Sequence, residues 1–468
     1  MLFPTLDFIL FLAAVVGVYW AVPKRVRVPV IAIASLLFYA SWKVSYLPIL
    51  IGIIVLAWSS GSWLAKKRRH PILRGLAYLA LFVPLLNYKY WNWISTNIEI
   101  LASNLGYPVN LPDVQAVLPI GISFFTFQAL AYVVDSNRDG KPESNLGRFA
   151  TFILFFPQLI AGPIVRRHEL LPQLNDPPLL RADQIGAGLF RIGRGMAKKL
   201  LIADIVRVGM VDPVFADPTR FGALELLVAL YAYTLQIYCD FSGYTDIAIG
   251  SARLFGIELP ENFRRPYLAT SIAAFWRRWH ITLSNWVRDY IYFGLGGAQV
   301  STWKVYRNFM ITFIVIGIWH GASWNFVIYG SLHGLASCIN RYQRKKTGRK
   351  PDDPLPSVWA WTWRFLLTFH FVVFARILFR APDLATSWTF AQGLWSNPFA
   401  MPRFSVLSWV ILFVGFAIHF SPMKWQPKAE RTFVQGGPIF WALVLALVGV
   451  CSMLVGTGEQ LNFIYYQF

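Results

Sequence analysis

The sequence predicts an all-α integral membrane protein that crosses the bilayer many times. Of its 468 residues, 56% are hydrophobic and only 14% are charged, whereas soluble domains carry about 25% charged residues. Apolar runs close to the roughly 20 residues that cross a hydrocarbon core recur along the chain. Basic residues lie in short clusters between these runs, as in the cytoplasmic loops of membrane proteins. We therefore expect a polytopic protein with about 10–12 transmembrane helices.

The net charge of +20 does not indicate a nucleic-acid partner, because the basic residues sit between apolar runs. Representative clusters are Lys24–Arg27, Lys66–Arg69 and Lys345–Lys350. Anionic lipid headgroups are the expected partners of such clusters. The three cysteines lie far apart and without metal-binding spacing, so neither a disulfide framework nor a metal site is predicted.

Eleven apolar runs could span the membrane. The first lacks the basic segment and the cleavage site of a signal peptide, so we interpret it as a retained helix. With basic loops assigned to the cytoplasm, the N-terminus and the tail Phe463–Phe468 fall outside, and the loop Asn97–Gln115 does too. The runs are Leu6–Val22, Val28–Trp42, Tyr46–Leu64, Leu73–Trp91, Leu118–Val134, Leu224–Tyr238, Phe309–Trp319, Trp324–Ile339, Trp359–Leu378, Val406–Phe420 and Phe440–Val455.

Three segments do not read as simple crossings. Phe149–Val165 contains Pro157 and Gly162, which predict a re-entrant or broken helix whose freed backbone groups need partners from protein or water. Pro260–Gly297 has too many arginines to span and too many aromatic residues for an ordinary loop. We expect non-spanning helices around a cavity from both segments.

The third segment, Gln184–Ile205, alternates apolar with basic residues and predicts an amphipathic helix on the cytoplasmic surface. Its expected basic face consists of Arg191, Arg194, Lys198 and Lys199.

His320 is the most conspicuous titratable residue, because it follows the apolar run Ile311–Trp319. An ionisable group at membrane depth is costly and should face a cavity or a polar partner. Its ordinary pKa near 6.5 suits proton transfer, and Gly321 would let a substrate approach. Residue patterns alone leave a catalytic and a packing role open for His320, and equally for His280. On a continuous helix His333 would lie about 140° from His320, which favours a packing or supporting role.

Other catalytic and nucleotide-binding motifs are absent from the sequence, and the remaining polar residues have structural explanations. The sequence holds no nucleophile elbow, Walker motif or dinucleotide-binding glycine pattern. Ser242 lacks the glycines that would flank a nucleophile. Asp240 and Asp246 are expected to form structural ion pairs with the arginine cluster of Phe275–Gly297. The remaining histidines are expected to be solvated or to pack.

Several segments closely resemble the signature of the membrane-bound O-acyltransferase family, in order and over nearly the whole chain. The resemblance is greatest to the bacterial branch that acetylates exported polysaccharides such as alginate and cellulose, and a related branch D-alanylates teichoic acids. Gly294 and Tyr329 depart from the family pattern. The resembling segments are Ile122–Asp135, Phe156–Arg166, Ile237–Tyr267, Phe275–Gly297, Gly317–Gly334 and Asn462–Phe468.

This resemblance implies one domain over residues 1–468, a helical ring around a central tunnel in the bacterial inner membrane. Residues 1–117 would form peripheral helices, 118–340 the catalytic core and 341–468 the C-terminal helices. By the same resemblance, His320 is the catalytic base and His280 the second active-site histidine. The donor would be cytoplasmic acetyl-CoA, and the acetyl group would pass to a hydroxyl acceptor, commonly through an extracytoplasmic acetyltransferase partner.

We expect the phosphates of acetyl-CoA at a cytoplasmic mouth, attracted by Arg264, Arg265, Arg277, Arg278 and the basic face of Gln184–Ile205. No bound cofactor or metal is expected. The residues expected to line the tunnel are Trp279, Asp240, Ser242, Trp319, Gly321, Trp324 and Asn325.

Three alternatives remain open from the sequence. The first is D-alanyl-type acyl transfer from a carrier-protein thioester to a cell-envelope polymer. The second is a non-enzymatic transporter of an acyl donor or glycan, although no internal repeat is visible. The third is a scaffold for a polysaccharide synthase.

Overall fold

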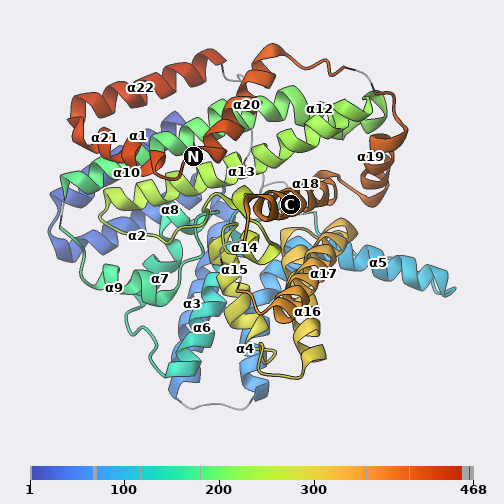
Figure 1. The fold of residues 1–468 in the computed structure, drawn as a ribbon. Coiled ribbons are helices and arrows are strands. Elements are labelled where there is room, and N and C mark those ends of the chain that lie inside the picture. The colour runs from blue at the N-terminus through green and yellow to red at the C-terminus, as the bar shows by residue number, and fades with distance from the viewer. Residues whose placement is uncertain are drawn as a thin grey trace. The chain divides into compact units, whose positions relative to one another are not determined.

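The computed structural model describes residues 3–66, 71–115, 117–179, 181–350, 353, 356–399, 401–455 and 463. These residues form helices and loops without a β-strand (Figure 1), which confirms the all-α class. Most of the basic cluster Lys66–Arg69 and of the segment Asn462–Phe468 lies outside the described residues. Two compact units divide the chain: residues 1–189 with 247–260, and residues 190–246 with 261–468. The prediction of one domain in three parts stays a prediction.

The first unit is built mainly from long helices that pack in pairs, α3 against α6 and α2 against α7. Helix α10 begins in this unit and ends in the second. The helices are α1 (Leu6–Ala21), α2 (Lys24–Ala40), η1 (Val44–Tyr46), α3 (Leu47–Lys66), α4 (Pro71–Leu85), η2 (Leu86–Tyr90), α5 (Trp91–Asn104), α6 (Ile122–Asp139), α7 (Leu146–Leu154), α8 (Phe156–Leu159), α9 (Arg167–Asn175) and α10 (Ala182–Met196).

The predicted broken helix is confirmed between α7 and α8, where the chain bends at Phe155. The break frees the carbonyl of Phe152, and the side-chain amides of Gln128 and Gln158 each donate to it at 2.8 Å. The N–H of Phe156 donates to the Ser35 hydroxyl at 3.1 Å. Protein groups therefore replace the lost helical bonds, as a buried break requires.

The second unit starts with short helical turns and continues with longer helices. Helix α13 begins in this unit and ends in the first. The elements are η3 (Ala197–Ala203), α11 (Asp204–Val206), η4 (Arg207–Val211), α12 (Asp212–Ala216), η5 (Pro218–Arg220), α13 (Ala223–Leu254), η6 (Pro266–Leu268), α14 (Ile272–Trp276), α15 (Ile281–Val287), η7 (Arg288–Tyr292), α16 (Thr302–His320), α17 (Trp324–Thr347), α18 (Val358–Arg380), α19 (Leu384–Ser396), α20 (Val406–Phe420), α21 (Trp425–Gln435) and α22 (Gly437–Val455).

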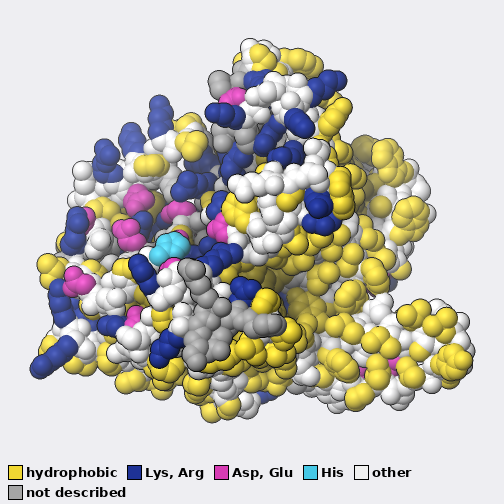
Figure 2. Space-filling view, turned by 90° about the horizontal axis from the view of Figure 1, so that it is seen from below, with side chains coloured by type: hydrophobic (Ala, Val, Ile, Leu, Met, Phe, Trp, Pro, Cys, Tyr) yellow, Lys and Arg dark blue, Asp and Glu magenta, His cyan; other side chains and the backbone are white. Residues whose placement is uncertain are grey.

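All eleven predicted apolar runs coincide with helices. By length and composition, 4 of the helices in the described part of the chain could cross a membrane, or 5 if the bent pair α20 and α21 is one span. Figure 2 shows a broad area of exposed hydrophobic side chains beside an area rich in Lys and Arg, as a multi-pass membrane protein requires. The predicted loop Asn97–Gln115 needs correction, because α5 continues to Asn104.

Candidate active site

His280 lies at the junction of two short helices, α14 and α15, and its side chain is fully buried. Its backbone takes a left-handed conformation with a φ of 42°, which is uncommon for residues other than glycine. The ring packs edge-on against Phe241, with the two ring centroids 4.7 Å apart. The segment Pro260–Gly297 thus folds as short helices, as predicted, and carries a strained residue of the kind that clusters at functional sites.

Asn262 fixes the orientation and the tautomer of His280. The Asn262 side-chain oxygen lies 3.1 Å from His280 Nδ1, and it also accepts hydrogen bonds from the backbone N–H and the hydroxyl of Thr282. Because an amide oxygen only accepts, Nδ1 carries the proton and Nε2 keeps the lone pair. Burial lowers the pKa of the His280 imidazole to about 3, so the ring is neutral near pH 7.

His320 is the last residue of α16 and is also buried. The chain turns at residues 321–323 and continues as α17, which packs along α16 (Figure 1). The Trp319 ring contacts both histidines, with its centroid 5.8 Å from that of His280 and 5.0 Å from that of His320. The structure therefore brings the two predicted histidines into one aromatic cluster.

Glycines bring α16 and α17 into close contact and so position His320. A Cβ on Gly317 would lie 2.1 Å from the backbone oxygen of Phe326, closer than side-chain atoms approach. A Cβ on Gly321 would lie 2.1 Å from the Phe326 ring. Gly321 therefore makes room for Phe326, and its predicted role in the approach of a substrate stays a prediction.

His333 belongs to the same aromatic region but has a structural partner. It accepts a hydrogen bond from Trp276 Nε1 at 3.3 Å. Tyr329 packs between the histidines, with centroid distances of 4.5 Å to His333 and 6.4 Å to His320. The premise of one continuous helix is wrong, because the chain reverses between α16 and α17. The hydrogen bond nevertheless agrees with a packing role for His333.

A buried guanidinium that sequence reasoning missed lies beside these rings. Arg376 of α18 is completely buried, and its Cζ lies 4.5 Å from the Trp279 ring centroid and 5.2 Å from that of Phe379. Phe379 in turn lies 4.9 Å from the His320 ring. A fixed positive charge stacked on aromatic faces gains cation–π stabilisation. The sequence contains a signal for this residue, because Arg376 is a charged residue within the apolar run Trp359–Leu378 and such residues are commonly functional.

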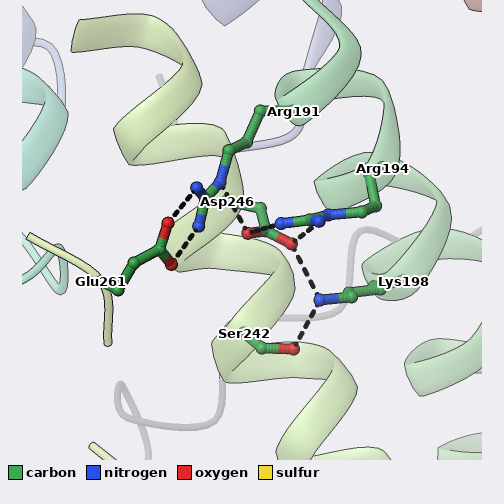
Figure 3. A network of polar contacts seen from close by, with 6 residues as sticks. All are labelled: Arg191, Arg194, Lys198, Ser242, Asp246 and Glu261. Carbon is green, nitrogen blue, oxygen red and sulfur yellow. Dashed lines mark hydrogen bonds and ion pairs between the residues drawn. The ribbon is translucent and has the colours of Figure 1, made fainter. Parts of the chain in front are cut away.

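Asp246 of α13 is the centre of a buried ion network (Figure 3). Its carboxylate accepts hydrogen bonds from Arg194 at 2.6 and 3.0 Å, from Arg191 Nε at 3.0 Å and from Lys198 Nζ at 2.8 Å. Glu261 makes a bidentate pair with Arg191. Burial alone raises the pKa of Glu261, but the hydrogen bonds and charge of Arg191 outweigh burial and hold that pKa below its usual value.

This network corrects the predicted surface helix. Arg191 and Lys199 are only 7% and 5% exposed, and the basic side chains point at carboxylates instead of at water or lipid. Lys199 pairs with Asp204 at 2.7 Å and with Asp240 at 3.0 Å. A charge in a low-dielectric interior needs a partner, and α13 supplies two of the carboxylates. Ion pairing of Asp240 and Asp246 is therefore confirmed. The partners that the structure shows come from α10 and η3, whereas the sequence predicts the arginine cluster of Phe275–Gly297.

A cavity of about 290 Å³ lies against the network. Its lining includes Arg264 and Arg265, and Ser242, whose hydroxyl accepts from Lys198 Nζ at 3.2 Å. The lining holds five basic side chains and two carboxylates, so it favours an anionic ligand. Arg277 instead lines a second cavity of about 380 Å³ with Arg288, Arg341 and Arg344. The structure thus separates Arg264 and Arg265 from Arg277, and Arg278 lines neither of these two cavities.

Comparisons with known proteins agree with the geometry. The profile of the membrane-bound O-acyltransferase family matches residues 58–379. The chain belongs to this family. It is 37% identical to a probable alginate O-acetylase of Pseudomonas putida, over 98% of each chain. It is 37% identical to a peptidoglycan O-acetyltransferase of Helicobacter pylori, over 78% of this chain and 73% of that protein. A teichoic acid D-alanyltransferase of Bacillus subtilis is 30% identical over 65% of this chain and 76% of its own.

As a member of this family, the protein is a multi-pass membrane O-acyltransferase. Membership of this family therefore favours an enzyme over the two non-enzymatic alternatives, the transporter and the scaffold. The matched segment contains both His280 and His320. No group of three or more potential metal ligands lies close together in the described part of the chain.

The remaining predicted lining residues have diverse surroundings. Trp279 is buried and stacks on Phe275, with ring centroids 5.8 Å apart. Asn325 is buried and donates from Nδ2 to the backbone oxygen of Ala381 at 2.9 Å, so it links the start of α17 to the end of α18. Trp324 is 51% exposed and does not share the buried surroundings of the histidines.

Proposed function

We propose that the protein is an O-acetyltransferase of the inner membrane that moves the acetyl group of acetyl-CoA to hydroxyl groups of an exopolysaccharide. The observation that carries the chemistry is the pair of buried histidines, His280 and His320, joined through Trp319. The similarity to alginate O-acetylases over nearly the whole chain supports acetyl as the group and an alginate-like polymer as the acceptor.

In this proposal His320 is the general base. It takes the proton of the acceptor hydroxyl as that oxygen attacks the thioester carbonyl carbon. The new C–O bond produces a tetrahedral oxyanion, which collapses with cleavage of the C–S bond. The CoA sulfur leaves and receives the proton from the His320 imidazolium, which restores the neutral ring.

His280 orients the acceptor and does not stabilise the oxyanion, because its proton on Nδ1 is donated to Asn262 and Nε2 carries a lone pair. With the proton on Nδ1, Nε2 is the ring nitrogen that can accept a hydrogen bond. The neutral His280 ring would accept a hydrogen bond from a second hydroxyl of the acceptor sugar, because the one proton of the attacking hydroxyl goes to His320. With its fixed charge, Arg376 would favour the negative charge that develops on the carbonyl oxygen.

The donor would place its phosphates in the cavity lined by Arg264 and Arg265. Its surplus of basic side chains supports this position. The acetyl group would then pass through a central tunnel towards an extracytoplasmic partner protein or directly to the polymer. The face of α13 that carries Tyr233 and Gln236 supports a polar path, because the Tyr233 hydroxyl and the Gln236 side-chain oxygen are buried without a hydrogen-bond partner among the described residues.

The donor is tested with the purified protein in lipid nanodiscs, by release of free CoA and acetylation of an alginate oligosaccharide. We expect activity with acetyl-CoA, and Arg264→Gln should raise the KM for acetyl-CoA about three- to tenfold with little change in kcat. Arg278→Gln is the matched control, since Arg278 lines neither basic cavity, and it should leave KM unchanged.

The similarity to a teichoic acid D-alanyltransferase supports one rival donor, a carrier-protein thioester. Transfer from a D-alanyl carrier protein together with inactivity towards acetyl-CoA would establish the rival and overturn the proposal.

A further inference from the structure

A groove of about 540 Å³ runs between the later part of α17 and the first half of α18. The apolar residues that line the groove lie three or four positions apart on each helix. This is the spacing of one helical face, so one face of each helix forms one wall. The apolar wall residues are Leu332, Leu335 and Ile339 of α17 and Trp363, Leu367 and Phe371 of α18.

The walls of the groove lie on the outside of the protein. Leu335 is 52% exposed and Leu367 is 59% exposed, and α18 is long and apolar enough to cross a membrane. In a bilayer such side chains contact acyl chains and not water. The groove is therefore open to lipid along its length.

One end of the groove is basic. Its described lining contains Arg344 in the last turn of α17, Arg349 and Lys350 just beyond that helix, and Arg364 near the start of α18, against one carboxylate, Asp353. Basic residues in a last helical turn also stabilise the helix dipole, but that effect does not account for Arg364, which belongs to the opposite helix.

Aromatic residues indicate the depth of this basic end. Trp359, Trp361 and Trp363 occur at alternate positions in the first turns of α18, and all three are exposed. Tryptophan is enriched at the level of the lipid headgroups. The basic cluster belongs to the loop that the positive-inside rule assigns to the cytoplasm, so the basic end of the groove lies at the cytoplasmic headgroup level.

We propose that this groove binds one anionic phospholipid of the cytoplasmic leaflet. The headgroup phosphate lies among Arg344, Lys350 and Arg364, and an acyl chain lies along the apolar walls. Charge complementarity selects the headgroup, because basic pockets between transmembrane helices bind anionic lipids. The exposed apolar walls favour a lipid over a soluble anion, because only the lipid has acyl chains whose contact with these walls adds binding free energy. The site does not depend on the acyl-transfer chemistry.

Native mass spectrometry of the full chain in detergent tests the proposal, with phosphatidylglycerol and phosphatidylcholine of identical acyl chains as probes. We expect one phosphatidylglycerol to remain bound under conditions that remove phosphatidylcholine. Arg344→Gln together with Arg364→Gln should weaken phosphatidylglycerol binding about tenfold. The control Lys345→Gln together with Lys346→Gln also removes two positive charges, but from residues at the end of α17 that do not line the groove. It should leave phosphatidylglycerol binding unchanged.

A second variant separates a lipid from a free anion. Leu335→Trp together with Leu367→Trp fills the apolar walls and keeps every charge, so it should abolish retention of the lipid. Equal binding of the two lipids, unchanged binding by the Arg344 and Arg364 variant, or displacement of the lipid by millimolar inorganic phosphate would each overturn the proposal.

Discussion

At the residue scale, the chemistry depends on how His280 is held. Its Nδ1 donates to Asn262, and Asn262 is itself fixed by the backbone and hydroxyl of Thr282. The ring therefore has one orientation and one tautomer, with Nε2 as its basic atom. Asn262 contacts the His280 ring through Nδ1, so it acts as a positioning residue through His280.

Asn262→Ala should lower kcat about ten- to hundredfold with little change in the KM for acetyl-CoA, because the His280 ring loses its fixed orientation. Removal of the shared acceptor should also lower the free energy of unfolding by about 1–3 kcal/mol. Steady-state kinetics and thermal denaturation in detergent measure the two effects. Asn262→Asp keeps an acceptor oxygen and should recover part of kcat, whereas a purely structural role predicts equal kcat in both variants once each is folded.

The low pKa of His280 gives a pH dependence of stability. Above about pH 6.5, the ring is neutral in both the folded and the unfolded protein. Between that value and the folded-state pKa of about 3, only the unfolded state binds the proton. The free energy of unfolding should therefore fall as the pH falls through this window. His280→Gln should show a smaller loss of melting temperature between pH 7 and pH 5, and an unchanged loss would contradict a buried neutral ring.

At the element scale, ion pairs hold α10, η3 and α13 together and form a structural joint between them. Asp246 compensates Arg191, Arg194 and Lys198 at once, and this joint positions the rim of the cavity to which the donor phosphates are assigned. The number of cations exceeds the number of carboxylates, so the joint keeps a positive field at its exposed side.

Asp246→Asn should lower the free energy of unfolding by about 3–5 kcal/mol, because it leaves buried cations without their carboxylate. Chemical denaturation in mixed micelles measures the change. Asp183→Asn is the control on α10, since its pair with Arg181 is exposed on both sides and should contribute at most about 1 kcal/mol. Equal effects of the two variants would show that the buried network is not a structural joint.

At the scale of the whole molecule, the apolar helices could be predicted because their signals are local in sequence. Residue patterns left the roles of His280 and His320 open, and only the resemblance to the family paired them. Apolar runs predict helices wherever they occur, and Pro157 and Gly162 predict the break between α7 and α8. The partners of the site could not be predicted in the same way. Asp246 meets Arg191 across 55 positions and His280 meets Asn262 across 18, and no periodicity encodes such contacts. The inward-facing helix α10 was missed for this reason, since its basic face looks the same whether it meets water or buried carboxylates.

The central claim is that the protein transfers acetyl groups with His320 as the base. Its most direct test is kcat for transfer from acetyl-CoA to a hydroxyl acceptor by purified His320→Ala in nanodiscs, beside the exposed-histidine control His168→Ala. We expect a loss of about 10²–10⁴-fold in kcat for His320→Ala, with wild-type kcat for His168→Ala and normal melting of both variants. Transfer at the wild-type rate by folded His320→Ala would contradict the central claim.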